Sequence, residues 1–147
     1  MDILARSTEA ARDRLTFLTA QIVFWALAAT DGHAKNFSLA HLPRNACRAT
    51  PLYDVLSVYP VPGNGRSQLA PQKAKLAMAV RGKNRHDALR EIFPKHWTAL
   101  GLCTGLTEDD VSAAIAAVAD ETERVIGEVS AAIPANFPMD VADAIFT

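Results

Sequence analysis

An apolar stripe near the amino terminus constrains the fold of this 147-residue chain more than any other feature. Its apolar residues recur at steps of three and four, namely Leu15, Leu18, Ile22, Trp25 or Ala26, and Ala29. Because that spacing places them on one face of a helix, we predict a buried amphipathic helix over residues 7–29. A polar turn at residues 30–32 is expected to end it.

A second long helix is predicted after Thr107, whose hydroxyl can cap the helix start. Three acidic residues follow at once, where the positive end of the helix dipole stabilises negative charge. The expected buried stripe of this helix consists of Val111, Ile115, Val118, Thr122, Val125, Ile126 and Val129. Pro134 and Pro138 are expected to end it.

The segment between these helices predicts one small β-hairpin and several short helices. The strands are expected at residues 36–41 and 48–52, with a turn at residues 43–45. Further along, we expect a helical turn at 55–59, a flexible loop at 60–71 around Gly63 and Gly65, an apolar segment of open type at 76–80, and helices at 85–92 and 95–102. The predicted fold class is therefore mainly α, with one small hairpin.

The length favours a single domain over residues 1–147 with a real core, and the composition is that of a globular protein, since half of the chain is apolar and about a fifth is charged. The longest apolar run, residues 22–29, is far shorter than the ~20 residues of a membrane span, and no signal peptide is apparent. Cys47 and Cys103 lie far apart and predict free thiols in a reducing compartment. We therefore expect a cytoplasmic protein without a membrane partner.

Charge is unevenly distributed along the sequence. Residues 60–100 contain eight Lys or Arg and two acidic residues. From residue 107 onward there are nine acidic residues, and Arg124 is the single basic one. This pattern leaves two interpretations open, a surface for an anionic partner or ordinary solvated faces. Direct binding of nucleic acid is disfavoured, because aromatic residues are not interleaved with the basic ones.

A polar loop carries the residues that suggest chemistry. Asp31 and Asn36 lie five residues apart where the first helix gives way to the first strand, and Asp54 follows after the hairpin. Phosphoryl transfer to a hydroxyl needs a carboxylate to take up its proton and oxygen ligands to hold Mg²⁺. The Asp-x₄-Asn spacing equals that of the protein-kinase catalytic loop. Because this spacing alone occurs often by chance, its wider context decides its meaning.

Three segments supply that context. Residues 31–38, DGHAKNFS, closely resemble the catalytic loop of HipA-like serine/threonine kinases, whose pattern is D-x-H-x-K-N-x-S. Residues 51–54, PLYD, are similar to the P-x-Y-D metal segment of the same family, and residues 75–78 match its KLAM segment. The three occur in order at matching distances. The resemblance implies the C-terminal lobe of a two-lobed, kinase-like fold.

The resemblance also implies roles for individual residues and two cofactors, Mg²⁺ and ATP. Asp31 would be the catalytic base, and Asn36 and Asp54 would bind Mg²⁺. Lys35 would lie near the phosphates or the substrate hydroxyl, and His33 would shape the loop. Residues that bind ATP are not assigned.

Each of these residues also has a purely structural interpretation. Asp31 can simply end a helix, Asn36 can start a strand, and Asp54 can cap a short helix. His33 can serve only as a hydrogen-bonding group in the loop, and Lys35 can point into solvent. Elsewhere, we expect Trp25 and Trp97 in the core and His86 and His96 at the surface.

The sequence contains no G-x-G-x-x-G or Walker A motif, and only about 30 residues precede the loop. HipA-like kinases carry their phosphate-covering parts in an N-terminal lobe, so we expect a catalytic lobe that is inactive alone and that can take an N-lobe in trans. The family implies a DNA-binding antitoxin partner and a protein substrate. The alternative is a non-catalytic lobe that docks on an antitoxin or an intact kinase.

Overall fold

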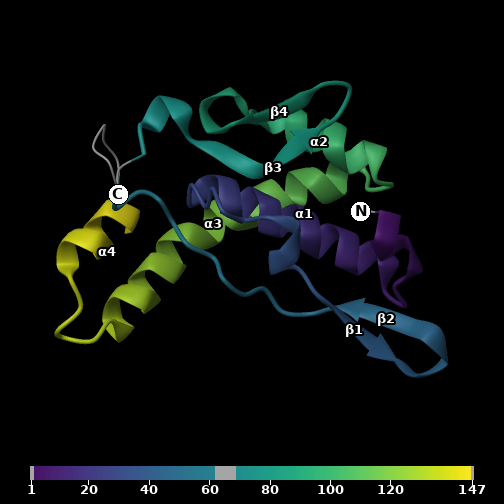
Figure 1. The fold of residues 1–147 in the computed structure, drawn as a ribbon, viewed down its shortest axis with the longest axis horizontal. Coiled ribbons are helices and arrows are strands. Elements are labelled where there is room, and N and C mark those ends of the chain that lie inside the picture. The colour runs from purple at the N-terminus through teal and green to yellow at the C-terminus, as the bar shows by residue number, and fades with distance from the viewer. Residues whose placement is uncertain (1, 62–68, 147) are drawn as a thin grey trace.

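The computed structural model describes residues 2–61 and 69–146, and within them the fold is mainly helical (Figure 1). The helices are α1 (Ala10–Ala26), α2 (Pro94–Cys103), α3 (Glu108–Ala132) and α4 (Met139–Phe146). The strands form two antiparallel pairs, β1 (Leu39–Leu42) with β2 (Ala46–Ala49) and β3 (Lys75–Arg81) with β4 (Arg85–Ala88). The mainly α class is therefore confirmed, with a second hairpin that the sequence did not predict.

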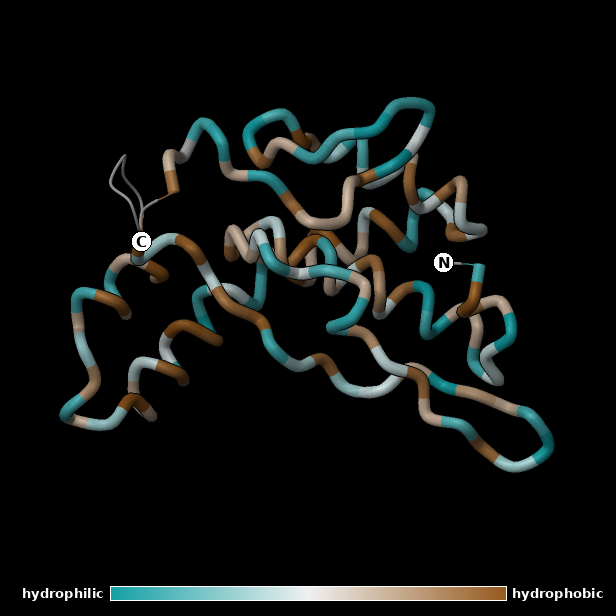
Figure 2. Tube along the Cα trace, viewed as in Figure 1, coloured by the Kyte–Doolittle hydropathy of each residue, from teal (hydrophilic) through white to brown (hydrophobic). Residues whose placement is uncertain are grey.

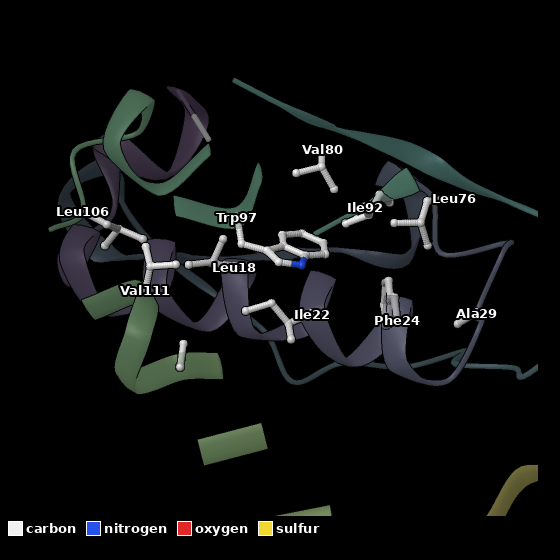
Figure 3. Packing of buried hydrophobic residues seen from close by; sticks show 11 residues of the cluster. Leu18, Ile22, Phe24, Ala29, Leu76, Val80, Ile92, Trp97, Leu106 and Val111 are labelled. Carbon is white, nitrogen blue, oxygen red and sulfur yellow. The ribbon is translucent and has the colours of Figure 1, made fainter. Parts of the chain in front are cut away.

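The core forms where α1, α2 and α3 meet under β3. Trp97 of α2 is 1% exposed and lies between Leu18 and Ile22 of α1 on one side and Val80 and Ile92 on the other (Figure 3). Apolar and hydrophilic residues alternate along the helices, while the outer turns of the hairpins are largely hydrophilic (Figure 2). The expectation of a buried Trp97 is confirmed, and the apolar stripe of α1 supplies one wall of the core.

Helix α1 is shorter than predicted at both ends, because local hydrogen bonds set its limits. At the start, the Ser7 hydroxyl donates to the Asp13 carboxylate at 2.5 Å and accepts the Glu9 N–H at 3.1 Å, in a turn that precedes the helix. At the end, Ala28 adopts a positive φ of 48°. The Ala28 and Ala29 N–H groups turn back to the carbonyls of Trp25 and Phe24, the pattern of a Schellman motif. The helix thus stops abruptly before the polar loop.

The first hairpin is present, although its strands are shorter than predicted. The ladder pairs Leu39 with Ala49 and Leu42 with Ala46. Asn36 lies outside it, in a 3₁₀ turn over Ala34–Asn36. The prediction of a strand starting at residue 36 was wrong, because the Asn36 side chain bonds within the loop instead. Figure 1 shows the hairpin extending away from the helices.

The predicted helix over residues 85–92 is wrong. Arg85–Ala88 is strand β4, and only Leu89–Glu91 forms a 3₁₀ turn. Strand β4 pairs with β3, which satisfies its backbone groups better than an isolated helical turn would. The apolar segment at 76–80 is accordingly part of a strand. The predicted helical turn at 55–59 is also wrong, since that stretch is irregular; the Gly63 and Gly65 loop lies outside the described residues.

Helix α3 begins as the sequence predicts. The Asp110 N–H donates to the Thr107 hydroxyl at 3.1 Å, and the Thr107 N–H donates back to the Asp110 carboxylate at 2.9 Å. The Thr107 backbone N–H, with its hydroxyl, holds the pKa of Asp110 below its ordinary value. This reciprocal arrangement is a capping box, which satisfies two backbone donors at the helix start.

Replacing Thr107 with alanine should lower the free energy of unfolding by about 1 kcal/mol, since it removes the cap of the longest described helix. Urea denaturation followed by circular dichroism measures the change. The matched control is Thr122→Ala in the middle of the same helix, where the hydroxyl donates only to the Val118 carbonyl. That change should be neutral or stabilising, because alanine is the better helix former. Equal losses in both variants would contradict the capping role.

The predicted buried stripe of α3 is correct only over the first part of the helix. Val111 is fully buried, whereas Val125 and Val129 are each 43% exposed. Helix α4, which the sequence did not predict, folds back beyond the proline-bounded turn. The second half of α3 lines a groove of about 1070 Å³ with the end of α1 and with α4. None of the described helices has the length and apolar character needed to cross a membrane.

His86 and His96, expected at the surface, are half-buried and stack on each other. Their ring centres lie 3.8 Å apart with an angle of 8° between the planes. The Nδ1 atom of His96 accepts a hydrogen bond from the Phe93 N–H at 3.2 Å, at the start of α2. Burial, the neighbouring His86 and the charge of Lys95 all lower the pKa of His96 from its ordinary value of 6.5.

This lowered pKa predicts that stability falls in mild acid. Unfolded His96 takes up a proton near pH 6.5, whereas the folded protein takes it up only at lower pH. The unfolded state therefore binds more protons as the pH falls, so this contribution to stability is full above about 6.5 and is lost below it. Urea unfolding at about pH 7.5 and about pH 5.5 measures the loss. In His96→Gln, which keeps an acceptor for the cap but does not titrate, the pH dependence should shrink; an unchanged dependence would contradict this assignment.

Candidate functional site

The candidate site is built on the loop that connects α1 to β1. Gly32 in this loop is buried, and a side chain there would overlap the ring of Phe24 on α1. The Thr30 carbonyl accepts a hydrogen bond from the Ala77 N–H of β3 at 3.1 Å. Helix α1 and strand β3 therefore fix the beginning of the loop from two sides, and the KLAM segment has a structural part in the site.

Asn36 is the buried centre of the loop. Its side chain is 2% exposed, and its Oδ1 atom accepts a hydrogen bond from the His33 N–H at 3.2 Å. Its Nδ2 atom donates to the Asp54 carboxylate Oδ2 at 2.8 Å and lies 3.4 Å from the Asp54 carbonyl. The loop and the segment after the hairpin thus meet through these two side chains.

Asp54 holds an unusual backbone conformation, with a φ of 58°. Glycine adopts this left-handed region most easily, and aspartate adopts it more readily than most other residues. Its neighbour Tyr53 donates its hydroxyl to the Lys35 carbonyl at 2.7 Å, and the same hydroxyl lies 2.8 Å from the Ser38 Oγ. The Tyr53 hydroxyl, the Asp54 carboxylate and the Asp54 carbonyl therefore join residues 53–54 to the loop.

Asp31 and His33 form a second pair at the loop surface. The Asp31 side chain is 79% exposed, and its Oδ1 lies 3.9 Å from the His33 Nε2. The Nδ1 of His33 is buried and has no hydrogen-bond partner among the described residues. The Lys35 side chain is exposed and makes no hydrogen bond or ion pair within the part of the chain that the structure describes. The Asp31 carboxylate is thus open to solvent, with the His33 imidazole 3.9 Å away.

The Asn36–Asp54 pair fits a magnesium ion chemically. Carboxylate and amide oxygens are the hard ligands that Mg²⁺ takes from proteins. Because an amide oxygen has two lone pairs, Asn36 Oδ1 retains one beyond its bond from the His33 N–H, and the Oδ1 of Asp54 accepts no hydrogen bond from the residues that the structure describes. The pair therefore has acceptor capacity left for an ion.

Tyr53 and Ser38 are site residues to which the sequence reasoning gave no role. Both lie inside the segments that carry the family resemblance, so the motifs contained the signal. What the sequence could not show is that the two segments bond to each other through these hydroxyls.

An apolar cavity of about 290 Å³ lies next to the loop, between α1 and the first hairpin. Phe37 lines it beside Phe17, and the two ring centres are 4.6 Å apart. Asp13 also borders the cavity, but its carboxylate already accepts the Ser7 hydroxyl and the Ala49 N–H. The loop, α1 and the hairpin thus all line this cavity, which adds no free charge to the site.

Comparison with known proteins identifies a family and a shared fold. The model of the HipA-like C-terminal domain family matches residues 1–126. Among solved structures, the chain is similar to one from the Shewanella oneidensis MR-1 toxin–antitoxin complex of HipA, HipB and operator DNA. The TM-score is 0.77 at 21% identity, which establishes a shared fold. The match covers 98% of this chain and 31% of that one, so the chain spans about a third of the length of its structural relative.

Proposed function

The chain belongs to the HipA-like C-terminal domain family, and we propose that it is the catalytic lobe of an ATP-dependent serine/threonine protein kinase of toxin–antitoxin type. The observation that carries the proposal is the direct contact of Asn36 with Asp54. These residues are 18 positions apart in sequence, yet their side chains bond at 2.8 Å, and Asn36 lies on the same loop as the exposed Asp31. An amide bonded to a carboxylate, together with an exposed carboxylate on the same loop as the amide, would supply the metal ligands and the base that phosphoryl transfer requires.

In this proposal, Asp31 accepts the proton of the substrate hydroxyl, because its carboxylate is open to solvent. His33 limits the directions in which Asp31 can turn, since its Nε2 lies 3.9 Å away. Asn36 and Asp54 would hold Mg²⁺, which when bound supplies positive charge for the phosphates of ATP. Lys35 is free to reach toward those phosphates or the substrate.

The proposed partners follow from the same family. The structural relative was solved with the antitoxin HipB and operator DNA, and we propose an antitoxin-like DNA-binding protein as a partner of this chain as well. A protein substrate and a cytoplasmic setting complete the proposal. Residues 1–147 would form one domain, the C-terminal lobe. The kinase N-terminal lobe, which covers the phosphates of ATP in such enzymes, would act together with it.

The test is a phosphorylation assay with radiolabelled ATP, using this chain alone and together with the N-terminal lobe of a related kinase. Label should enter protein only when the two lobes are combined, because positioning and electrostatic stabilisation dominate this chemistry. Sedimentation shows whether the lobes associate. A pair that associates and stays folded without any phosphorylation would contradict the kinase proposal and support a docking lobe instead.

A further inference from the structure

We propose that Tyr53 is a positioning residue whose hydroxyl holds Asp54 against Asn36. The proposal rests on the proposed function of this site, since it concerns how the two metal ligands are kept together. It assigns a role to a side chain that touches neither the ion nor the substrate. The structure offers one hydroxyl that connects the two segments next to the ligand pair.

The Tyr53 hydroxyl uses both of its hydrogen-bonding capacities on the loop. A phenol has one proton to donate, and at 2.7 Å the Lys35 carbonyl accepts it. The Ser38 hydroxyl, 2.8 Å away, must therefore act as the donor to the Tyr53 oxygen. One oxygen atom thus joins the residue before Asn36 to the residue two positions after it.

The two connections run in register. Lys35 and Tyr53 are 18 residues apart in sequence, and so are Asn36 and Asp54. The hydroxyl bond therefore lies one residue away from the ligand contact on both segments. Any sliding of one segment past the other would break both bonds together.

The segment that carries Asp54 has few other hydrogen bonds, and Val55 packs against the core beside it. Residues 51–57 are irregular, between the Thr50 N–H bond to Ser38 and the Val58 N–H bond to Ala28. Within the described residues, the hydrogen bonds that tie 51–57 to the loop involve only Tyr53 and Asp54. Asp54 also sits in a left-handed conformation that it would leave easily if released.

The hydroxyl, more than the ring, accounts for this effect. The Tyr53 side chain lies at the surface, with 44% of the residue exposed. Phenylalanine at this position keeps the ring and its partial burial while it removes only the two hydrogen bonds. Tyr53→Phe therefore isolates the positioning effect.

Tyr59 provides a matched control. It is 43% exposed, and its hydroxyl donates to the Ala26 carbonyl at the end of α1, at 3.1 Å. Tyr59→Phe thus removes an equally exposed phenol bonded to a backbone carbonyl, but not one that joins the two ligand segments. Any general cost of losing such a bond appears in both variants.

The experiment measures Mn²⁺ affinity of the 147-residue chain by paramagnetic broadening of its NMR signals. Tyr53→Phe should raise the dissociation constant about tenfold, as is typical when a group that orients a metal ligand is removed. Tyr59→Phe should leave it unchanged. Without metal, the side-chain amide resonance of Asn36 should shift in Tyr53→Phe and stay in place in Tyr59→Phe.

The outcomes separate this inference from the proposed function. If Tyr53→Phe has the same Asn36 side-chain resonance and the same Mn²⁺ affinity as the unchanged protein, the positioning role of Tyr53 is overturned. Asp54→Asn tests the metal site itself, and Mn²⁺ binding that survives this change would refute that site. In that case the metal-free Asn36 resonance still decides whether Tyr53 positions the pair.

Discussion

Replacing Trp97 with alanine should lower the free energy of unfolding by about 3–5 kcal/mol, the largest stability loss expected for a single change in this chain. Trp97 is 1% exposed and joins α2 to α1 and β3. Its ring also meets Trp25 edge-on, with ring centres 6.2 Å apart. The alanine variant would leave a cavity that three elements border, so little of it can close. Thermal and urea denaturation measure the effect.

Two further variants make this prediction decisive if the alanine variant does not fold. Trp97→Phe should cost much less, because it keeps an aromatic ring and removes an indole N–H that has no hydrogen-bond partner among the described residues. Phe93→Ala, at a position 51% exposed just before the same helix, should cost under about 1 kcal/mol. A Phe93 loss as large as that of Trp97 would contradict the view of Trp97 as the centre of the core.

The long helices could be predicted because their signals are local. The stripe of α1 and the capping residue of α3 lie within the segments that they describe, and both helices exist. The apolar stripe of α3 could not show how far along the helix the core packs against it. Val111 is buried against the core, while Val125 lines the groove toward α4 and stays 43% exposed. Periodicity predicts a face, whereas burial depends on what folds against it.

The second hairpin could not be predicted for a related reason. The sequence from Arg85 to Ala88 has no clear alternation of apolar and polar residues. Its strand conformation comes from pairing with β3 across a short turn, and an ion pair of Lys75 with Asp87 at 3.4 Å adds to that contact. Both are contacts between segments, which a window on the sequence does not contain.

The candidate site shows the same division. The motifs marked Asp31, His33, Lys35, Asn36 and Asp54, and the structure brings Asn36 to Asp54 and His33 to Asp31. The Tyr53 and Ser38 hydroxyls join the loop to the segment that carries Asp54. Their role depends on how the two segments align in space, which the sequence motifs do not show. The assignment of catalytic and metal roles stays a prediction, and mutation of the proposed base tests it most directly.

Replacing Asp31 with asparagine should reduce phosphorylation by about 10²–10⁴-fold in the reconstituted pair of lobes, because a positioned base contributes that much to proton transfer. The change keeps the size of the side chain and removes its ability to take up a proton. The Asp31 side chain is largely exposed and its carboxylate accepts no backbone hydrogen bond from the described residues, so folding and association with the N-terminal lobe should be preserved. Sedimentation and circular dichroism on the same samples check this.

The control for Asp31→Asn is Asp109→Asn, which removes an exposed carboxylate in the first turn of α3, outside the loop. It changes the net charge by the same amount, so a general charge effect on ATP or on lobe association would appear in both variants. We expect full activity in Asp109→Asn and loss in Asp31→Asn alone. Phosphorylation by the pair that persists without Asp31 would show that another group takes the hydroxyl proton, and the base would then have to be sought elsewhere on the loop, at His33 first because it lies beside Asp31.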